Sequence, residues 1–158
     1  MFPSRYKRKL ANYVVKMKIN HIYLGEAKEI LQTIPNASID MCMTSPPYWA
    51  LRDYGKKQQI GLESNFNDYI DRLCNIFDEV KRVLKKEGTC WINLGDTYYS
   101  KSGNDFKEDK LSGKNAVVSG LARANKLRGL GLLPSKSLTL IPFRFAIEMV
   151  SRGWILRN

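Results

Sequence analysis

The chain has 158 residues, of which 44% are hydrophobic and 26% charged, which is the length and balance of one compact domain with a buried core. No apolar run approaches the roughly 18 residues of a membrane span, and residues 1–20 are not built like a signal peptide, so we expect a cytoplasmic protein without membrane contact. Three separated cysteines (Cys42, Cys74, Cys90) and a single histidine, His21, argue against a disulfide framework and a metal site.

The formal net charge of +11 is concentrated in two parts of the chain. Residues 1–20 hold six basic and no acidic side chains, and residues 101–136 hold eight basic against three acidic ones. We therefore expect a basic leader over 1–20 and a long basic loop within 98–136, both suited to the phosphates of a nucleic acid. The alternative is that the surplus charge serves solubility alone.

The hydrophobic pattern predicts alternating strands and helices. In chain order they are a strand over His21–Leu24, a helix over Ala27–Ile34, a strand over Ile39–Thr44, a helix over Asn65–Lys86, a strand over Thr89–Leu94, a helix over Thr139–Ser151 and a strand over Trp154–Arg157. Ser64 or Asn65 can cap the long helix and Gly88 can follow its last turn. The strand over Thr89–Leu94 is apolar enough to be covered on both faces. This order predicts a largely parallel sheet with ligands at the carboxyl ends of its strands.

A rigid turn follows the second predicted strand, in the sequence Ser45-Pro46-Pro47-Tyr48-Trp49. Two consecutive prolines can continue neither a strand nor a helix, and their nitrogens donate no hydrogen bond. The carbonyl groups of the turn and the Ser45 hydroxyl can therefore accept hydrogen bonds from an amine, beside the flat faces of Tyr48 and Trp49. This combination suits a planar heterocycle held by its exocyclic amino group. Alternatively, the prolines only end the strand and the aromatic rings join the core.

The run Thr44-Ser45-Pro46-Pro47-Tyr48-Trp49 resembles the catalytic motif of S-adenosylmethionine-dependent DNA amino-methyltransferases, which methylate cytosine N4 or adenine N6. Further segments resemble the same family in the same order: Tyr23–Ala27, Ser38–Asp40, Leu51–Gly55, Ile60–Glu63, Val80–Lys85, Gly95–Thr97 and Gly153–Asn158. The resemblance implies an α/β, partial Rossmann-like class I methyltransferase fold with a mostly parallel sheet flanked by helices. Residues 21–158 would form its catalytic portion.

The resemblance also implies how individual residues act. A base flipped out of DNA would stack on Tyr48, while Ser45 and the Pro46 carbonyl orient its amino group toward the methyl group of S-adenosylmethionine. The expected catalytic residues are Ser45, Pro46, Pro47 and Tyr48. The expected substrate-binding residues are Trp49, Arg52, Tyr54, Lys126 and Arg128, and the expected cofactor-binding residues are Glu26, Thr44 and Asp96. None of the cysteines is needed as a nucleophile, and we expect all three to fill the core.

The sequence departs from the family in its cofactor region. It has no Phe-x-Gly-x-Gly loop, and its Gly129-Leu130-Gly131 lies in the basic loop without a preceding strand. Glu26 stands where the family usually has Asp. Because the cofactor loop follows the catalytic half in permuted members of the family, we expect this chain to be the catalytic half, completed by a cofactor-binding chain or within a longer protein. A partner chain or self-association would also cover a strand edge left exposed.

Two other functions fit the same residues. The chain could be a non-catalytic nucleic-acid-binding module that keeps the fold without a cofactor site, or it could methylate an amine on RNA. If the substrate is DNA, the serine before the prolines favours cytosine N4 over adenine N6.

Overall fold

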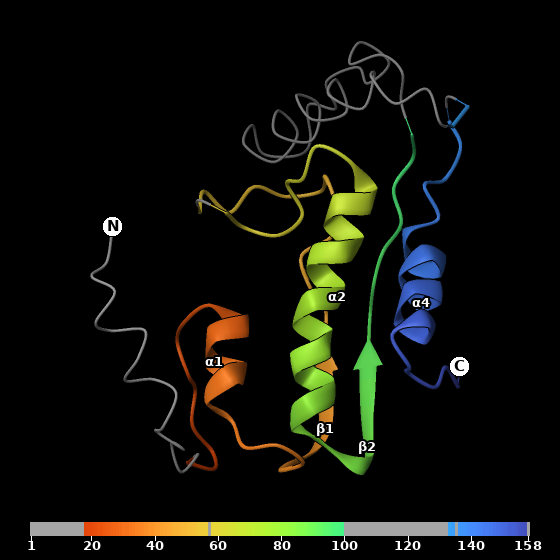
Figure 1. Ribbon diagram of the computed structural model, residues 1–158. Helices are drawn as coiled ribbons and strands as arrows, with labels where there is room; N and C mark the ends of the chain where they lie inside the picture. Colours follow the sequence, from red (N-terminus) through yellow and green to blue (C-terminus); the bar gives the residue numbers. More distant parts are fainter. Residues whose placement is uncertain (1–17, 57, 100–132, 135, 158) are drawn as a thin grey trace, which may run out of the picture. The chain divides into compact units, whose positions relative to one another are not determined.

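The computed structural model describes residues 18–56, 58–99, 133–134 and 136–157. Its elements are α1 (Ala27–Thr33), β1 (Ile39–Thr44), α2 (Phe66–Val83), β2 (Leu84–Ile92) and α4 (Ile141–Ser151) (Figure 1). The chain divides into two compact units, Met1–Met43 with Asn75–Trp91 and Thr44–Cys74 with Ile92–Asn158. The basic leader up to residue 17 and most of the basic loop, including Lys126 and Arg128, lie outside the described residues.

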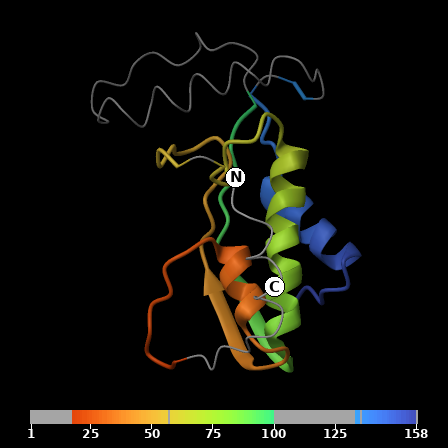
Figure 2. The same ribbon diagram turned by 60° about the vertical axis from the view of Figure 1, so that its left-hand side comes forward.

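The first unit contains a strand–helix–strand arrangement. β1 and β2 pair in a two-stranded parallel sheet, and α2 is the connection between them (Figure 2). The register advances in the same direction along both strands, because Gly88 lies against the Asp40 carbonyl and the Cys90 side chain bonds that of Cys42. The expectation of an α/β fold with parallel strands is confirmed at this level.

Arg82, near the end of α2, holds the end of α1 in the first unit. Its guanidinium donates to the carbonyls of Leu31 at 2.7 Å and Ile34 at 3.0 Å, and it pairs with Glu79 at 2.8 Å. The last carbonyls of a helix have no partner within the helix. Arg82 satisfies these groups at the end of α1 and thereby fixes the short helix to α2.

The boundary between α2 and β2 differs from the prediction. The helix ends at Val83 and the strand begins at Leu84, without an intervening loop. Gly88 therefore lies within β2 and not after a helix, and Lys85 pairs with Asp40 of β1 at 2.6 Å. At its other end α2 starts at Phe66, one residue later than predicted, and Asn65 is its cap as expected, because the Asn65 side chain accepts from the Asp68 amide at 2.9 Å. The predicted helix ran to Lys86, but Leu84, Lys85 and Lys86 belong to β2, where pairing with β1 outweighs their helical pattern.

Two predicted strands are absent from the described part of the chain. His21–Leu24 and Trp154–Arg157 have no strand structure. A strand needs a neighbour to bond its backbone groups, and in the described residues only β1 and β2 form a sheet. β2 is also not covered on both faces, since 52% of Trp91 is exposed.

The second unit contains the first half of α2 and the whole of α4. An antiparallel bridge joins Tyr98 to Leu138, and the Tyr99 amide donates to the Ser137 carbonyl at 2.7 Å. α4 starts at Ile141, two residues later than predicted, because Leu140 has a left-handed backbone with φ of 59°. In the described residues no helix has the length and apolar character that crossing a bilayer requires.

Candidate active site

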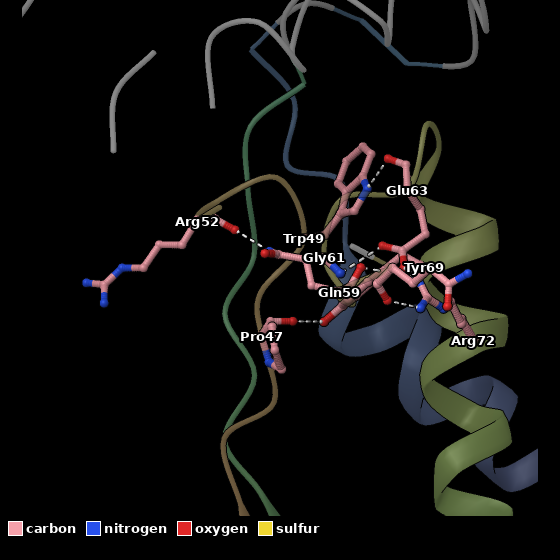
Figure 3. Close-up of polar contacts among 9 residues, drawn as sticks. Pro47, Trp49, Arg52, Gln59, Gly61, Glu63, Tyr69 and Arg72 are labelled. Carbon is pink, nitrogen blue, oxygen red and sulfur yellow. Dashed lines mark hydrogen bonds and ion pairs between the residues drawn. The ribbon is translucent and has the colours of Figure 1, made fainter. Parts of the chain in front are cut away.

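The predicted turn begins directly after β1, whose last residue is Thr44. The buried hydroxyl of Tyr69, on α2, donates to the carbonyl oxygen of Pro47 at 2.9 Å (Figure 3). Burial raises the pKa of Tyr69, and the charges of Glu63 and Tyr48 raise it further. The phenol therefore keeps its proton and acts as a permanent donor to this carbonyl.

The two hydroxyl groups of the turn contact each other. The Ser45 hydroxyl is exposed and donates to the Tyr48 hydroxyl at 3.2 Å. In the described residues no donor reaches the Pro46 carbonyl. Tyr69 already bonds the Pro47 carbonyl, so the proline carbonyl of the turn without a donor is that of Pro46, and the Ser45 oxygen beside it keeps lone pairs that can accept from an amine.

Two glycines lie against Tyr48. A Cβ on Gly95 would lie 2.8 Å from Cε2 and 2.9 Å from Cδ2 of the Tyr48 ring. A Cβ on Gly61 would lie 2.7 Å from the Tyr48 backbone oxygen, and Gly61 also has a φ of 94°, which side chains disfavour. Both positions therefore need glycine, one for its closeness to the ring and the other for its closeness and backbone conformation.

Trp49 belongs to the core of the second unit. Its indole nitrogen donates to the Glu63 carbonyl at 3.1 Å (Figure 3). Its ring is 2% exposed and packs edge-on against Phe66, with ring centroids 6.0 Å apart. A ring buried in this way offers no face to a base. The substrate role expected for Trp49 thus has no support from its position, and the core alternative describes this ring.

Arg72 of α2 organises the loop after the turn. It pairs with Glu63 at 2.8 Å and donates to the carbonyls of Gln59 at 3.1 Å and of Gln58 (Figure 3). The second carboxylate oxygen of Glu63 accepts from the Gly61 amide at 2.8 Å. The Glu63 side chain is only 7% exposed. The buried Glu63 carboxylate, paired with Arg72, therefore fixes the loop to α2.

The expected substrate residues Arg52 and Tyr54 are both exposed on that loop. The Gln59 side chain fixes their backbone, donating to the Arg52 carbonyl at 2.9 Å and accepting from the Tyr54 amide at 2.7 Å. The loop backbone is therefore bonded in place, while the two side chains extend outward.

The expected cofactor residues are engaged in the fold itself. The Glu26 carboxylate caps α1 by accepting from the Glu29 amide at 3.0 Å, and the Thr44 carbonyl accepts from the Asn93 amide at 3.0 Å. The Asp96 carboxylate accepts four hydrogen bonds, from the Thr139 hydroxyl and from the amides of three residues: Thr97, Leu140 and Ile141.

Asp96 thus supplies the cap that α4 lacks, since Leu140 makes no side-chain cap bond. The groups bonded at these three positions serve helix ends and a strand pair. Their expected cofactor role stays a prediction.

The sequence indicated Ser45, Pro47 and Tyr48 but not the two residues that contact them, Tyr69 and Gly95. Gly95 was identified only as part of the family segment Gly95–Thr97. A tyrosine on an apolar helix face is an indirect signal, because its hydroxyl needs a partner when buried.

The cysteines contribute packing and one thiol pair. Cys74 is fully buried in α2, as expected, whereas Cys42 and Cys90 are half-buried on β1 and β2. A hydrogen bond from Cys90 lowers the pKa of Cys42 to about 7, against the opposing effect of burial. The same bond, together with burial, raises the pKa of Cys90. Cys42 is therefore a thiolate in part at neutral pH.

A family model described as DNA methylase, for N6 and N4 methylation, matches residues 39–158, from the start of β1 onward. The match includes the whole turn and the loop it carries. The chain belongs to this DNA methylase family.

Relatives of this methylase chain are Type II methyltransferases. It is 40% identical to M.XycI of Xanthomonas campestris pv. cyanopsidis, over 99% of this chain and 50% of the relative. It is 41% identical to M.Cfr9I of Citrobacter freundii, over 87% of this chain and 44% of the relative. It is 39% identical to M.SfiI of Streptomyces fimbriatus, over 87% of this chain and 28% of the relative. The methylase chain thus spans at most about half the length of these relatives, and no solved structure matches it.

Proposed function

We propose that this chain is the catalytic half of a DNA methyltransferase that methylates the exocyclic amino group of a flipped base. The observation that carries the proposal is the division of acceptors in the turn. Tyr69 takes the Pro47 carbonyl, so the Pro46 carbonyl and the Ser45 hydroxyl stay available beside Tyr48. The family and the Type II relatives support DNA as the substrate, which would put the activity in the cytoplasm.

The proposed work of the turn is to orient a poor nucleophile. The lone pair of an exocyclic amine is delocalised into the ring of the base. Hydrogen bonds from its N–H groups to Ser45 and Pro46 favour the pyramidal nitrogen of the transition state, and stacking on Tyr48 holds the base in place. S-adenosylmethionine, when bound, supplies an electrophilic methyl group on a sulfonium. With that group bound, the N–C bond would form as the S–C electron pair returned to sulfur, and the proton of the methylated amine would pass to solvent beside the exposed Ser45.

We propose further that a cofactor-binding half completes the site. The described candidates for cofactor binding are engaged in capping and strand pairing, which supports a donor site elsewhere. One sheet face in the first unit also exposes apolar side chains: Met41 is 52%, Met43 70% and Trp91 52% exposed. Met41 and Met43 flank Cys42 on β1, and Trp91 follows Cys90 on β2. Because side chains alternate along a strand, the three apolar side chains lie on the sheet face opposite the two cysteines. A polypeptide corresponding to the unmatched part of the relatives is the occupant we propose.

A chimera tests this function. This chain would replace the matching half of M.XycI, and duplex DNA treated with the chimera and S-adenosylmethionine would be digested to nucleosides for mass spectrometry. We expect N4-methylcytosine, because serine precedes the prolines. N6-methyladenine would keep the enzyme class and reverse the base. The chimera carrying Tyr48→Ala is the matched control.

The alternatives make different predictions for the same chimera. A folded chimera that binds DNA and leaves every nucleoside unmethylated would support the non-catalytic binding module. Methylated nucleosides in RNA and none in DNA would support the RNA amine.

A further inference from the structure

The backbone of Gly95 lies so close to the Tyr48 ring that a side chain at position 95 would not fit between them. An added Cβ would be 2.8 Å from Cε2, 2.9 Å from Cδ2 and 3.5 Å from Cζ of the ring. Contacts below 3.0 Å are essentially never made by a real Cβ. The Gly95 backbone is therefore in direct contact with one side of the tyrosine ring.

The backbone conformation does not itself demand glycine here. Among the described glycines, φ is positive at Gly55, Gly61 and Gly153 and not at Gly95. Alanine can thus adopt this backbone, and what it cannot do is fit beside the ring. The reason for glycine at this position is the space that Tyr48 occupies.

The backbone at Gly95 is fixed on both sides, so the ring would have to move. Two residues earlier, the Asn93 amide donates to the Thr44 carbonyl at 3.0 Å. The next residue, Asp96, is held by its bonds to Thr139 at 2.7 Å and to Leu140 at 3.0 Å. A methyl group at 95 would meet a backbone anchored by these bonds, whereas Tyr48 turns about its side-chain torsions.

Two other contacts constrain Tyr48, one at its backbone and one at its hydroxyl. Its backbone carbonyl faces Gly61, and its hydroxyl accepts from Ser45 at 3.2 Å. A ring displaced by a side chain at 95 would lose or lengthen the contact with Ser45, whose hydroxyl is one of the two acceptors available to an amine.

We propose that Gly95 is a positioning residue for the base-stacking ring, acting through Tyr48 and not on the base itself. The inference rests on the proposed function for its catalytic consequence, but the contact itself does not. In this proposal the backbone at Gly95, three residues after the end of β2, contacts the Tyr48 ring and sets its position. A misplacement of about 1 Å in an active site can cost about 100-fold in rate.

The contact is tested first, without DNA or cofactor. In the 158-residue chain, the Hα resonances of Gly95 should be shifted by the ring current of Tyr48, and Tyr48→Leu should abolish the shift. Unchanged Gly95 resonances in Tyr48→Leu would overturn the inference whatever the enzyme does.

The consequence is tested in the M.XycI chimera with a fluorescent base analogue at the target position. Gly95→Ala should lower the flipped-base signal and the single-turnover methyl-transfer rate by about 10- to 100-fold. The salt-dependent affinity for DNA should stay within about twofold, because the phosphate contacts are unaffected. Gly88→Ala is the matched control, since the nearest atoms to its Cβ would belong to Lys85, Asp40 and Leu84, at 3.0–3.2 Å, and none of them to Tyr48.

A double-mutant cycle separates positioning from general damage. If Gly95 acts through Tyr48, adding Gly95→Ala to Tyr48→Ala should cause no further loss of rate. Full additivity of the two losses, or a Gly95→Ala chimera with parental flipping and transfer, would overturn the inference. A parental chimera that neither flips nor methylates would instead count against the proposed function, leaving the resonance test to decide the contact.

Discussion

The Tyr69 hydroxyl reaches 22 residues back along the chain to donate to the Pro47 carbonyl at 2.9 Å. This bond joins the first half of α2 to the turn that carries the proposed catalytic residues. It also distinguishes the two proline carbonyls, since that of Pro46 has no donor in the described residues.

Tyr69→Phe should lower the free energy of unfolding by about 1 to 3 kcal/mol, because the half-buried Pro47 carbonyl loses its donor. The raised pKa of Tyr69 means that the native state holds this proton more tightly than the unfolded state does. The stabilisation is therefore present below the ordinary tyrosine pKa of about 10 and is lost only above it.

Urea unfolding of the parent and Tyr69→Phe measures the difference in stability, which should be the same at pH 7 and pH 9 and smaller above about pH 10. Tyr54→Phe is the matched control, because that tyrosine is 56% exposed and should change stability by less than about 0.5 kcal/mol. Equal stability of Tyr69→Phe and the parent would show that the bond contributes nothing.

The Cys42 thiol should react with iodoacetamide at a rate that rises through a midpoint near pH 7, since its pKa is lowered to about 7 and the thiolate is the reactive form. Cys90→Ala removes the hydrogen bond that lowers this pKa, so the midpoint should move upward, toward the ordinary value of 9.0. Mass spectrometry of the alkylated peptides gives the rate at each site. A midpoint unchanged by Cys90→Ala would contradict the thiol pair.

Much of this fold could be predicted because it depends on local pattern. β1 has the predicted bounds, and the apolar face of α2 is buried as its spacing requires, at Phe66, Tyr69, Ile70, Leu73, Phe77, Val80 and Val83. Periodicity identifies which face is covered. It says nothing about where the polar tip of a covered residue ends, so the bond from Tyr69 to Pro47 could not be predicted.

The turn itself could be predicted from its prolines, but the residues that hold it could not. Arg72 and Asp96 act across 9 and 43 residues of sequence, on Glu63 and Thr139. Such partners are set by how segments pack, which a single sequence does not specify. The same limit explains why the strands predicted over His21–Leu24 and Trp154–Arg157 were wrong: an apolar pattern does not show whether a neighbouring strand is there to pair with.

S-adenosylmethionine should bind weakly or not at all to this chain alone. The sequence has no Phe-x-Gly-x-Gly loop, and the Asp96 carboxylate accepts hydrogen bonds from the amides of Leu140 and Ile141 at the start of α4. Isothermal titration of the purified 158-residue chain should give no measurable heat, while the M.XycI chimera should bind. Micromolar binding by the chain alone would contradict the need for a cofactor half.

DNA binding should be electrostatic, with Lys126 and Arg128 among the phosphate contacts. Each neutralised phosphate adds about 0.9 to the slope of log affinity against log salt. Replacing both residues by alanine should therefore flatten the slope by up to about two units. Fluorescence anisotropy with a labelled duplex from 50 to 200 mM salt, a span of about fourfold, measures it. An unchanged slope would exclude these two residues from the interface.

The central claim, that the turn orients an amine beside a stacking ring, is tested most directly by single-turnover methyl transfer in the M.XycI chimera, with a fluorescent base analogue reporting on flipping. Ser45→Ala should flip the base normally and transfer the methyl group slowly, because it removes an acceptor that matters most as the nitrogen rehybridises. Tyr48→Ala should lose flipping, since stacking of a base on an aromatic ring is worth about 1–3 kcal/mol, and Tyr48→Phe should keep it. Methyl transfer at the parental rate by Ser45→Ala, or normal flipping and transfer by Tyr48→Ala, would contradict the account.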